Sequence, residues 1–215
     1  KYGLKVTYDK DLLSLDSSNM LFNDCSIDCG DSGTTARLLI GYLTGLNLST
    51  TVSGSAALSK RPMDRIINPL RNFGANIQVG ENQLPAILNK SKQLNAFDFE
   101  LVIPSAQIKS ALILYAISLN GKSIIRGKIK TRDHLELLLS YLQYPISIKK
   151  DRIEVYGGFK IKKYMDFKIP GDVSSAAFVI AAAILTQHSN IIIKDICINK
   201  YRIGFLRAII KMGAK

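Results

Sequence analysis

Hydrophobic side chains recur along this chain with two periods, one typical of strands and the other of helices. The first residues predict a strand over 4–8 and a further short apolar stretch before residue 20. The pattern after residue 30 then predicts, in order, a helix over 35–44, a strand over 49–52, a helix over 62–73, and strands over 75–79 and 84–88. We expect Gly45 and Gly74 to stop the two helices and Pro62 to begin the second one.

The same order of elements returns further along the chain. The second series is a strand over 99–103, a helix over 104–119, a strand over 123–125, a helix over 131–141, and strands over 146–148 and 153–155. A third series begins with a strand over 167–169, a helix over 176–185, a strand over 191–193 and a helix over 200–211. The sequence therefore predicts an α/β fold made of repeated βαβαββ units of about 70 residues. The third unit stops midway, so we expect the chain to be a piece of something longer.

Small polar residues precede several of the predicted helices. The clearest case is Asp31-Ser32-Gly33-Thr34-Thr35, and Ser105-Ala106-Gln107 and Thr131-Arg132 stand at equivalent places. A helix start exposes backbone N–H groups and carries about half a positive charge, which favours bound anions. One such start is most often only an N-cap. Their repetition predicts that several helix starts share an anion site.

The charge balance agrees with an anionic partner but does not identify it. The 215 residues have a formal net charge of +12, with 47% hydrophobic and 21% charged residues, as in an ordinary globular protein. A nucleic-acid site, a general lysine bias and a pocket for phosphorylated metabolites are all compatible with this charge. The lysines are scattered and no basic run has interleaved aromatics, so we expect no nucleic-acid partner.

Cysteine and hydrophobic content set further bounds. Three cysteines, Cys25, Cys29 and Cys197, form no Cys-x-x-Cys pair, which predicts neither a disulfide framework nor a zinc site. No stretch reaches the roughly 18 consecutive apolar residues of a membrane span, and no signal-peptide pattern opens the chain. We therefore expect a reducing, cytoplasmic location without membrane contact.

Five stretches carry a resemblance to a known family. They are DCGDSGTTARLL (28–39), LSKRPMDRIINPLRNFGA (58–75), PSAQIKSALIL (104–114), KTRDHLELLL (130–139) and PGDVSSAAF (170–178). In this order and spacing the chain resembles the enolpyruvyl (carboxyvinyl) transferases, and among them the EPSP synthases, 3-phosphoshikimate 1-carboxyvinyltransferases. The TRDH and SAQ motifs are similar to the second of that family's two sequence classes.

The resemblance implies an inside-out α/β barrel of the enolpyruvyl transferase type, incomplete in this chain. Residues 1–168 would be the N-terminal substrate-binding domain without its first unit, and 169–215 the hinge and the first part of the second domain. The family's catalytic Asp and Lys/Glu groups would lie outside these residues, so we expect no catalytic residue here and no activity from the 215 residues alone.

The resemblance also assigns substrate-binding residues. Gly33, through its backbone N–H, and Arg61 would hold the phosphate of phosphoenolpyruvate, and a guanidinium fork suits a phosphate well. The residues implied for shikimate-3-phosphate are Ser105, Ala106, Gln107, Thr131 and Arg132. Arg132 could instead pair locally with Asp133, and His134 is expected to cap a helix or to be packed. Asp172, Ser174 and Ser175 are expected to form an N-cap.

The implied reaction transfers the enolpyruvyl group of phosphoenolpyruvate to the 5-hydroxyl of shikimate-3-phosphate and releases phosphate, a step of aromatic amino-acid biosynthesis. It needs no metal or organic cofactor. The full-length protein would be a monomer, and glyphosate, a mimic of phosphoenolpyruvate, would fit beside Gly33, where a methyl group would crowd it.

Two alternatives and one departure from the family remain. A UDP-N-acetylglucosamine 1-carboxyvinyltransferase would carry a cysteine before its Arg-Pro motif, and the loop 53–60 has none. A noncatalytic relative that binds phosphate or RNA is favoured only by the net charge. Asp31 stands where the family usually has Asn, and a carboxylate near a phosphate is unfavourable unless it is paired; Arg37 and Lys109 are its candidate partners.

Overall fold

The computed structural model describes residues 3–10, 12–20, 24–81, 83–161 and 168–214. Its centre is built from two four-stranded sheets with the same internal order. The first sheet runs β3-β4-β6-β5. Its strands are β3 (Cys25–Asp28), β4 (Thr50–Ser53), β5 (Asn76–Val79) and β6 (Ala86–Asn89). β3 pairs with β4 in parallel, and β6 pairs antiparallel with both β4 and β5.

The second sheet repeats this topology. It runs β7-β8-β10-β9, and its strands are β7 (Asp98–Leu101), β8 (Gly121–Gly127), β9 (Ile146–Ile148) and β10 (Arg152–Gly157). β7 and β8 are parallel, and β10 is antiparallel to both β8 and β9. The equivalent pairings in the two sheets confirm the βαβαββ repeat that the hydrophobic pattern predicted.

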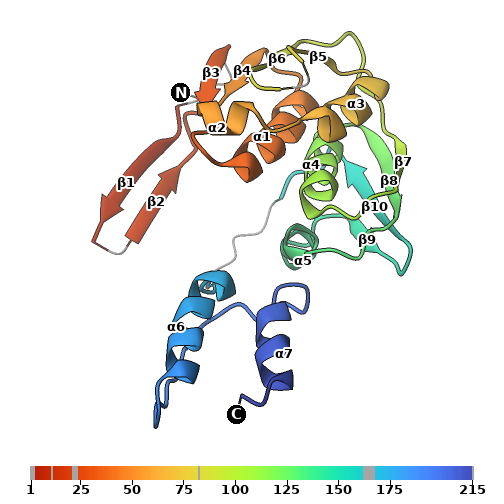
Figure 1. Cartoon of the computed structure of the whole chain (residues 1–215). Helices are drawn as coiled ribbons and strands as arrows, with labels where there is room; N and C mark the ends of the chain where they lie inside the picture. Colours follow the sequence, from red (N-terminus) through yellow and green to blue (C-terminus); the bar gives the residue numbers. More distant parts are fainter. Residues whose placement is uncertain (1–2, 11, 21–23, 82, 162–167, 215) are drawn as a thin grey trace.

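Two helices pack side by side and join the units (Figure 1). α1 (Gly33–Gly45) contacts β4 and β6 of its own sheet, and α4 (Ala106–Ile117) contacts β8 and β10. The helices approach closely because glycines face α4: a Cβ on Gly41 would come within 2.3 Å of the Ala111 carbonyl oxygen. The shorter helices are α2 (Ala56–Ser59), α3 (Asp64–Asn72) and α5 (His134–Tyr141). Together these elements enclose one core, which includes Ile40, Leu43, Leu70, Leu112 and Val155.

Some predicted helix boundaries are wrong because tertiary contacts decide them. Gly45 does not stop α1 but is its buried last residue, and a Cβ there would lie 2.7 Å from the Tyr115 carbonyl oxygen. Asn47, at φ 57°, takes the left-handed conformation instead. Pro62 does not begin a helix. It lies between the separate helix α2, which ends at Ser59, and α3, which starts at Asp64.

Four further predictions differ from the structure. α5 begins at His134 rather than at residue 131, and α7 (Gly204–Lys211) begins four residues later than expected. Residues 191–193 form no strand, since no described strand pairs with them. Of the predicted strand over 167–169, Lys168 and Ile169 are not in a strand, and Phe167 lies outside the described residues.

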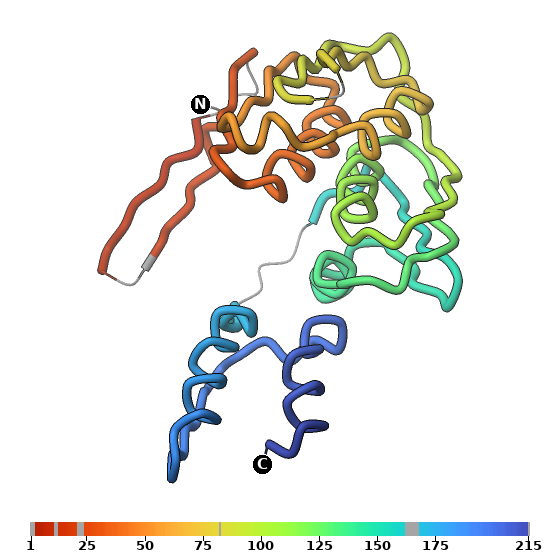
Figure 2. The backbone as a smooth tube through the Cα atoms, in the orientation of Figure 1, coloured from red at the N-terminus to blue at the C-terminus, as the bar shows by residue number. Residues whose placement is uncertain are grey.

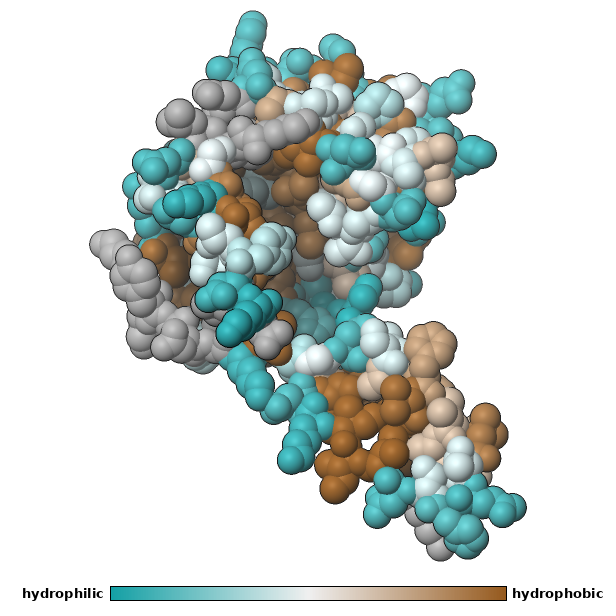
Figure 3. Space-filling model, turned by 90° about the vertical axis from the view of Figure 1, so that its left-hand side faces the viewer, coloured by the Kyte–Doolittle hydropathy of each residue, from teal (hydrophilic) through white to brown (hydrophobic). Residues whose placement is uncertain are grey.

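Two parts of the chain extend from the centre, as the backbone path in Figure 2 shows. One is the antiparallel hairpin of β1 (Lys5–Asp9) and β2 (Leu12–Asp16). The other holds α6 (Val173–Leu185) and α7, where apolar side chains gather on the surface seen in Figure 3; Phe178 is 81% exposed and Leu185 is 85% exposed. Among the described residues, none of these helices has the length and apolar character needed to cross a membrane.

Candidate anion-binding site

The first part of the site is the start of α1. Ser32 caps this helix, since its hydroxyl accepts a hydrogen bond from the Thr35 N–H at 3.1 Å. The Gly33 N–H, expected to face a phosphate, donates instead to the Asp31 carbonyl at 3.1 Å. Gly33 leaves room for two guanidinium groups, because a Cβ there would lie 2.6 Å from Arg37 Nη1 and 3.4 Å from Arg61 Nη1. The structure therefore places Gly33 and Arg61 together.

Arginine side chains gather at this point. Arg37 donates from Nη1 to the Gly33 carbonyl at 3.2 Å and from Nη2 to the Pro62 carbonyl at 3.1 Å. Burial lowers the pKa of Arg37, and the positive charges of Arg61 and Arg65 lower it further. None of these three guanidinium groups forms an ion pair within the part of the chain that the structure describes. Such a cluster is electrostatically favourable for a bound anion.

Asp31, the departure from the family pattern, has a partner that the sequence did not indicate. Its Oδ1 accepts a hydrogen bond from the Ser55 hydroxyl at 2.5 Å. Neither expected partner contacts it: Arg37 is held by backbone carbonyls, and Lys109 pairs with Glu136 on α5. The Asp31 carboxylate is thus tied to the start of α2.

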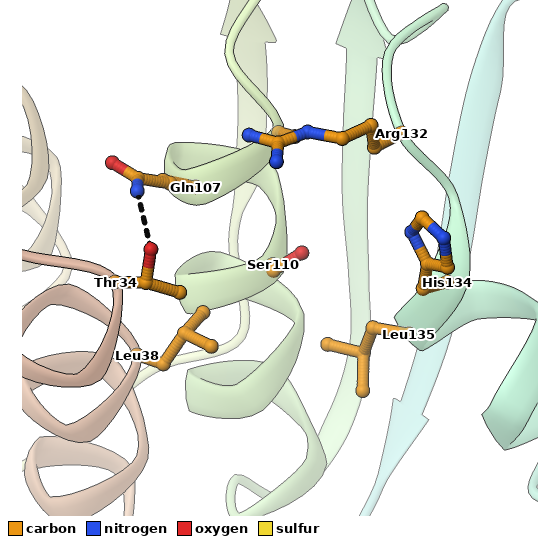
Figure 4. Close-up of a pocket in the computed structure, with 8 residues that line it drawn as sticks. Thr34, Leu38, Gln107, Ser110, Arg132, His134 and Leu135 are labelled. Atoms are coloured by element: carbon orange, nitrogen blue, oxygen red, sulfur yellow. Dashed lines mark hydrogen bonds between the residues drawn. The ribbon is translucent and has the colours of Figure 1, made fainter. Parts of the chain in front are cut away.

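The second part of the site is the start of α4, which lies next to the start of α1. Ser105 is the N-cap, and its hydroxyl accepts from the Ile108 N–H at 3.4 Å. Gln107 Nε2 donates to the Thr34 hydroxyl at 2.8 Å, the contact drawn in Figure 4. This bond links the two helix starts across 73 residues of sequence. Neutral donors and the positive ends of two helix dipoles therefore converge here.

The third part is the segment between β8 and α5. An open pocket is lined by Ser105, Ala106, Gln107, Thr131 and Arg132, together with Pro104, Lys130 and Tyr201. The Arg132 side chain also lines the adjoining pocket and extends across the start of α4 toward Gln107 (Figure 4). The structure thus brings five of the seven predicted binding residues into one pocket. Gln107 connects that pocket to the Gly33 and Arg61 group through Thr34.

Other expectations about this segment need correction. Asp133 does not pair with Arg132, because its Oδ1 accepts from Asn199 Nδ2 at 2.7 Å. His134 neither caps α5 nor is packed in the core. It lines the adjoining pocket, with Nε2 3.6 Å from the Cys197 Sγ. Asp172, in contrast, is the N-cap of α6, as expected. Its carboxylate accepts hydrogen bonds from the Ser174 N–H and the Ser175 hydroxyl, and these bonds, together with the charge of Arg202, hold the pKa of Asp172 below its usual value.

Sequence reasoning missed several residues that line the two pockets. They are Thr34, Leu38, Ser110, Leu135 and Tyr201. Thr34 and Ser110 could have been found, because each lies within one or two turns of a predicted helix start. Tyr201 also lies in the first turn of a predicted helix, over 200–211, but α7 begins only at Gly204, and tertiary folding brings Tyr201 to this pocket.

The lining chemistry favours binding of anions. The described residues that line the two pockets include hydroxyl, amide, imidazole, ammonium and guanidinium groups but no carboxylate. Among the described residues, no three His, Cys, Asp or Glu side chains come together as ligands of a metal ion would. The site can therefore hold multiply charged anions through neutral and cationic donors.

Comparison with known proteins extends this picture. The family model for EPSP synthase (3-phosphoshikimate 1-carboxyvinyltransferase) matches residues 5–215. A 3-phosphoshikimate 1-carboxyvinyltransferase from Clostridium tetani is 38% identical over 99% of this chain and 48% of its own length. One from Oceanobacillus iheyensis is 40% identical over 100% of this chain and 49% of its own length. The chain thus spans about half the length of the curated relatives it matches.

The solved structures agree with the sequence comparison. The structure of EPSP synthase from Acinetobacter baumannii superposes with a TM-score of 0.85 and 31% sequence identity, covering 100% of this chain and 49% of that one. This similarity confirms an incomplete α/β fold of the enolpyruvyl transferase type. The matching family model favours the EPSP synthases over the UDP-N-acetylglucosamine 1-carboxyvinyltransferases, the alternative enzyme considered from the sequence. With its repeated units, its converging helix starts and a match over residues 5–215, this chain belongs to the EPSP synthase family.

Proposed function

We propose that this chain forms the substrate-binding wall of an EPSP synthase, which transfers the enolpyruvyl group of phosphoenolpyruvate to the 5-hydroxyl of shikimate-3-phosphate and releases phosphate. The observation that carries this proposal is the hydrogen bond between Gln107 and Thr34 at 2.8 Å. It joins the starts of α1 and α4, so that the Gly33 and Arg61 group lies next to the helix start that lines the pocket of Ser105 and Arg132. Two phosphorylated substrates that must meet need such an arrangement.

Each group suits one of the two phosphates. Arg37 and Arg61, which pack against Gly33, form a cationic cluster without a carboxylate ion-pair partner among the described residues, which suits phosphoenolpyruvate. The other pocket offers the Ser105 hydroxyl and the Arg132 guanidinium, with Ala106, Gln107 and Thr131 between them. Neutral and cationic donors together suit the 3-phosphate of shikimate-3-phosphate. Glyphosate would occupy the first cluster as a mimic of phosphoenolpyruvate.

The reaction proceeds by addition and elimination, as the family resemblance implies. Phosphoenolpyruvate is protonated at C3, the hydroxyl attacks C2 and loses its proton, and the tetrahedral intermediate eliminates phosphate together with a proton from C3. The contribution of these residues is to gather two anions and to exclude water around them. The acid–base groups of the family are expected outside these residues, so binding rather than turnover is the property to measure on this chain.

The organisation of the whole protein is part of the same proposal. Residues 1–168 would belong to the N-terminal domain, and residues 169–215 to the hinge and the beginning of the second domain. A domain division of this kind allows closure over both substrates. We also propose a cytoplasmic location and a monomeric full-length protein, with no nucleic-acid or membrane partner.

Isothermal calorimetry tests the proposal. The chain is titrated with shikimate-3-phosphate, alone and in the presence of phosphoenolpyruvate. We expect binding that the Arg132→Gln substitution weakens about 10- to 150-fold, because a hydrogen bond to a charged group contributes about 1.5–3 kcal/mol. The matched control is Arg207→Gln, which removes the same charge from an exposed position on α7.

The controls separate a specific site from general attraction by the net charge. Equal weakening by both substitutions would contradict the proposal, because the net charge rather than the pocket would then hold the ligand. Salt-dependent RNA binding without binding of shikimate-3-phosphate would favour the noncatalytic alternative instead.

A further inference from the structure

A buried ion pair lies directly behind the candidate site. The Lys109 ammonium is 2.5 Å from Glu136 Oε1, and both side chains are only 1% exposed. Lys109 belongs to α4, whose other buried residues are mainly apolar, and Glu136 lies in the first turn of α5. Burying two charges is unfavourable unless further hydrogen bonds satisfy them. The groups that donate to or accept from this pair therefore indicate which segments it holds in place.

Lys109 contacts more than its carboxylate partner. Its Nζ also donates to the carbonyl oxygens of Ile129 at 3.0 Å and Thr131 at 3.4 Å. The Ile129 carbonyl accepts in addition from the Thr131 N–H at 2.7 Å and lies 3.5 Å from the Thr131 hydroxyl. One ammonium group thus satisfies backbone carbonyls of the segment that leads into Arg132, and this segment lacks a helical hydrogen-bond ladder of its own.

The same lysine is attached to the opposite wall of the pocket. Its backbone N–H donates to the Ser105 carbonyl at 3.1 Å in the first turn of α4. Ser105 and Thr131 face the same pocket from two different elements. Lys109 therefore links both walls from behind, and Glu136 ties α5 to the same point.

We propose that Lys109, held in place by Glu136, is a positioning residue that fixes Thr131 and Arg132 relative to Ser105 and Gln107. The inference rests on the proposed function, in which these residues hold the sugar phosphate. Neither side chain touches the ligand. The pair acts through the backbone of residues 129–131, which carries Arg132 into the pocket.

A purely structural role makes a different prediction. Replacing a buried ion pair with apolar residues often leaves stability unchanged or improves it, whereas removing one partner leaves an uncompensated charge. Glu136 Oε2 has no hydrogen-bond partner among the described residues, so the carboxylate depends strongly on Lys109. Two apolar side chains in place of the pair would remove the cost of burying these charges, but they could not donate hydrogen bonds to the Ile129 and Thr131 carbonyls.

Three variants of this chain separate the two roles. Lys109→Met leaves the carboxylate unpaired and removes the donor to the carbonyls. The double variant Lys109→Met with Glu136→Leu removes both charges, and Glu136→Gln retains the lysine and its carbonyl contacts. The measurements are denaturant unfolding, amide hydrogen exchange at Thr131, and calorimetric titration with shikimate-3-phosphate. The Ala75 amide, which donates to Leu70 at the end of α3, is the reference for exchange.

We expect the double variant to recover most of the stability lost in Lys109→Met. In both variants, exchange at Thr131 should be at least about 10-fold faster relative to Ala75, and the Kd for shikimate-3-phosphate about 10-fold higher. Glu136→Gln should stay within about 3-fold of the unsubstituted chain in both quantities, since the glutamine amide oxygen can still accept a hydrogen bond from Lys109 and the carbonyl contacts persist.

Unchanged exchange at Thr131 in the double variant would overturn the inference, as would equally rapid exchange in Glu136→Gln. Should the double variant not fold, the comparison of Lys109→Met with Glu136→Gln still decides, because the inference requires faster exchange at Thr131 in the first and a protected Thr131 amide in the second. If the unsubstituted chain does not bind shikimate-3-phosphate, the proposed function fails. Exchange without ligand still shows whether Lys109 orders the segment.

Discussion

Replacing Gly41 with alanine should force α1 away from α4 and weaken both the fold and the candidate site. The added Cβ would lie 2.3 Å from the Ala111 carbonyl oxygen and 2.8 Å from its carbon, whereas ordinary van der Waals contact begins at 3.4 Å. These are backbone atoms of a buried helix, so they cannot rotate aside as a side chain would. The two helices must therefore separate by about 1 Å, a strain of the kind that overpacked cores show.

The cost follows from two opposing effects. Overpacking of a well-packed core destabilises by about 1–3 kcal/mol, while alanine in place of a helical glycine contributes up to about 1 kcal/mol of stability. We expect the free energy of unfolding to fall by about 1–2 kcal/mol. A separation of about 1 Å would also lengthen the Gln107–Thr34 bond, now 2.8 Å, beyond hydrogen-bond distance.

Urea denaturation and calorimetry with shikimate-3-phosphate measure the two effects. Gly204→Ala is the matched control, because Gly204 also lies in a helix and nothing lies within 4 Å of the position of its Cβ. Its stability should stay unchanged or rise by up to about 1 kcal/mol. If Gly41→Ala is as stable as Gly204→Ala and binds equally well, close contact between α1 and α4 does not limit either property.

Further substitutions test the electrostatics. Gly33→Ala should displace the flexible Arg37 guanidinium and lower the calorimetric affinity for phosphoenolpyruvate with little loss of stability; equal affinity would show that Gly33 does not control the cluster. Hydrogen bonds from Arg152 and Lys149 lower the pKa of Glu154 to about 2, so Glu154→Gln should reduce stability at pH 7. In urea titrations at several pH values, this difference should narrow as the pH falls from about 4.5 toward about 2, because the carboxylate then becomes protonated in both states. Asp31→Asn should raise the affinity for inorganic phosphate at low salt, since it removes a negative charge beside the anion site, and unchanged affinity would show that the carboxylate is turned away.

The sequence predicted the repeat and the helix starts beside the candidate site because both depend on local patterns, whereas the binding residues themselves came from the family resemblance. Alternating hydrophobic periods specify which segments are strands and helices, and small hydroxyl residues mark helix starts. Ser32 and Ser105 do cap α1 and α4 as those patterns indicate. The motifs 28–39 and 104–114 therefore place Gly33 and Gln107 at helix starts without the help of any tertiary contact.

The tertiary structure decided which distant groups meet. Asp31 pairs with Ser55 rather than with Arg37 or Lys109, and Lys109 is buried against Glu136 instead. Packing also changed local expectations: Gly45 is the buried last residue of α1, where it allows close contact with α4, rather than the residue just beyond the helix. The apolar residues 191–193 form no strand, because a strand needs a neighbour for its backbone hydrogen bonds and no described strand is adjacent. Sequence patterns thus determined the local elements, whereas partners across long separations depend on how those elements pack.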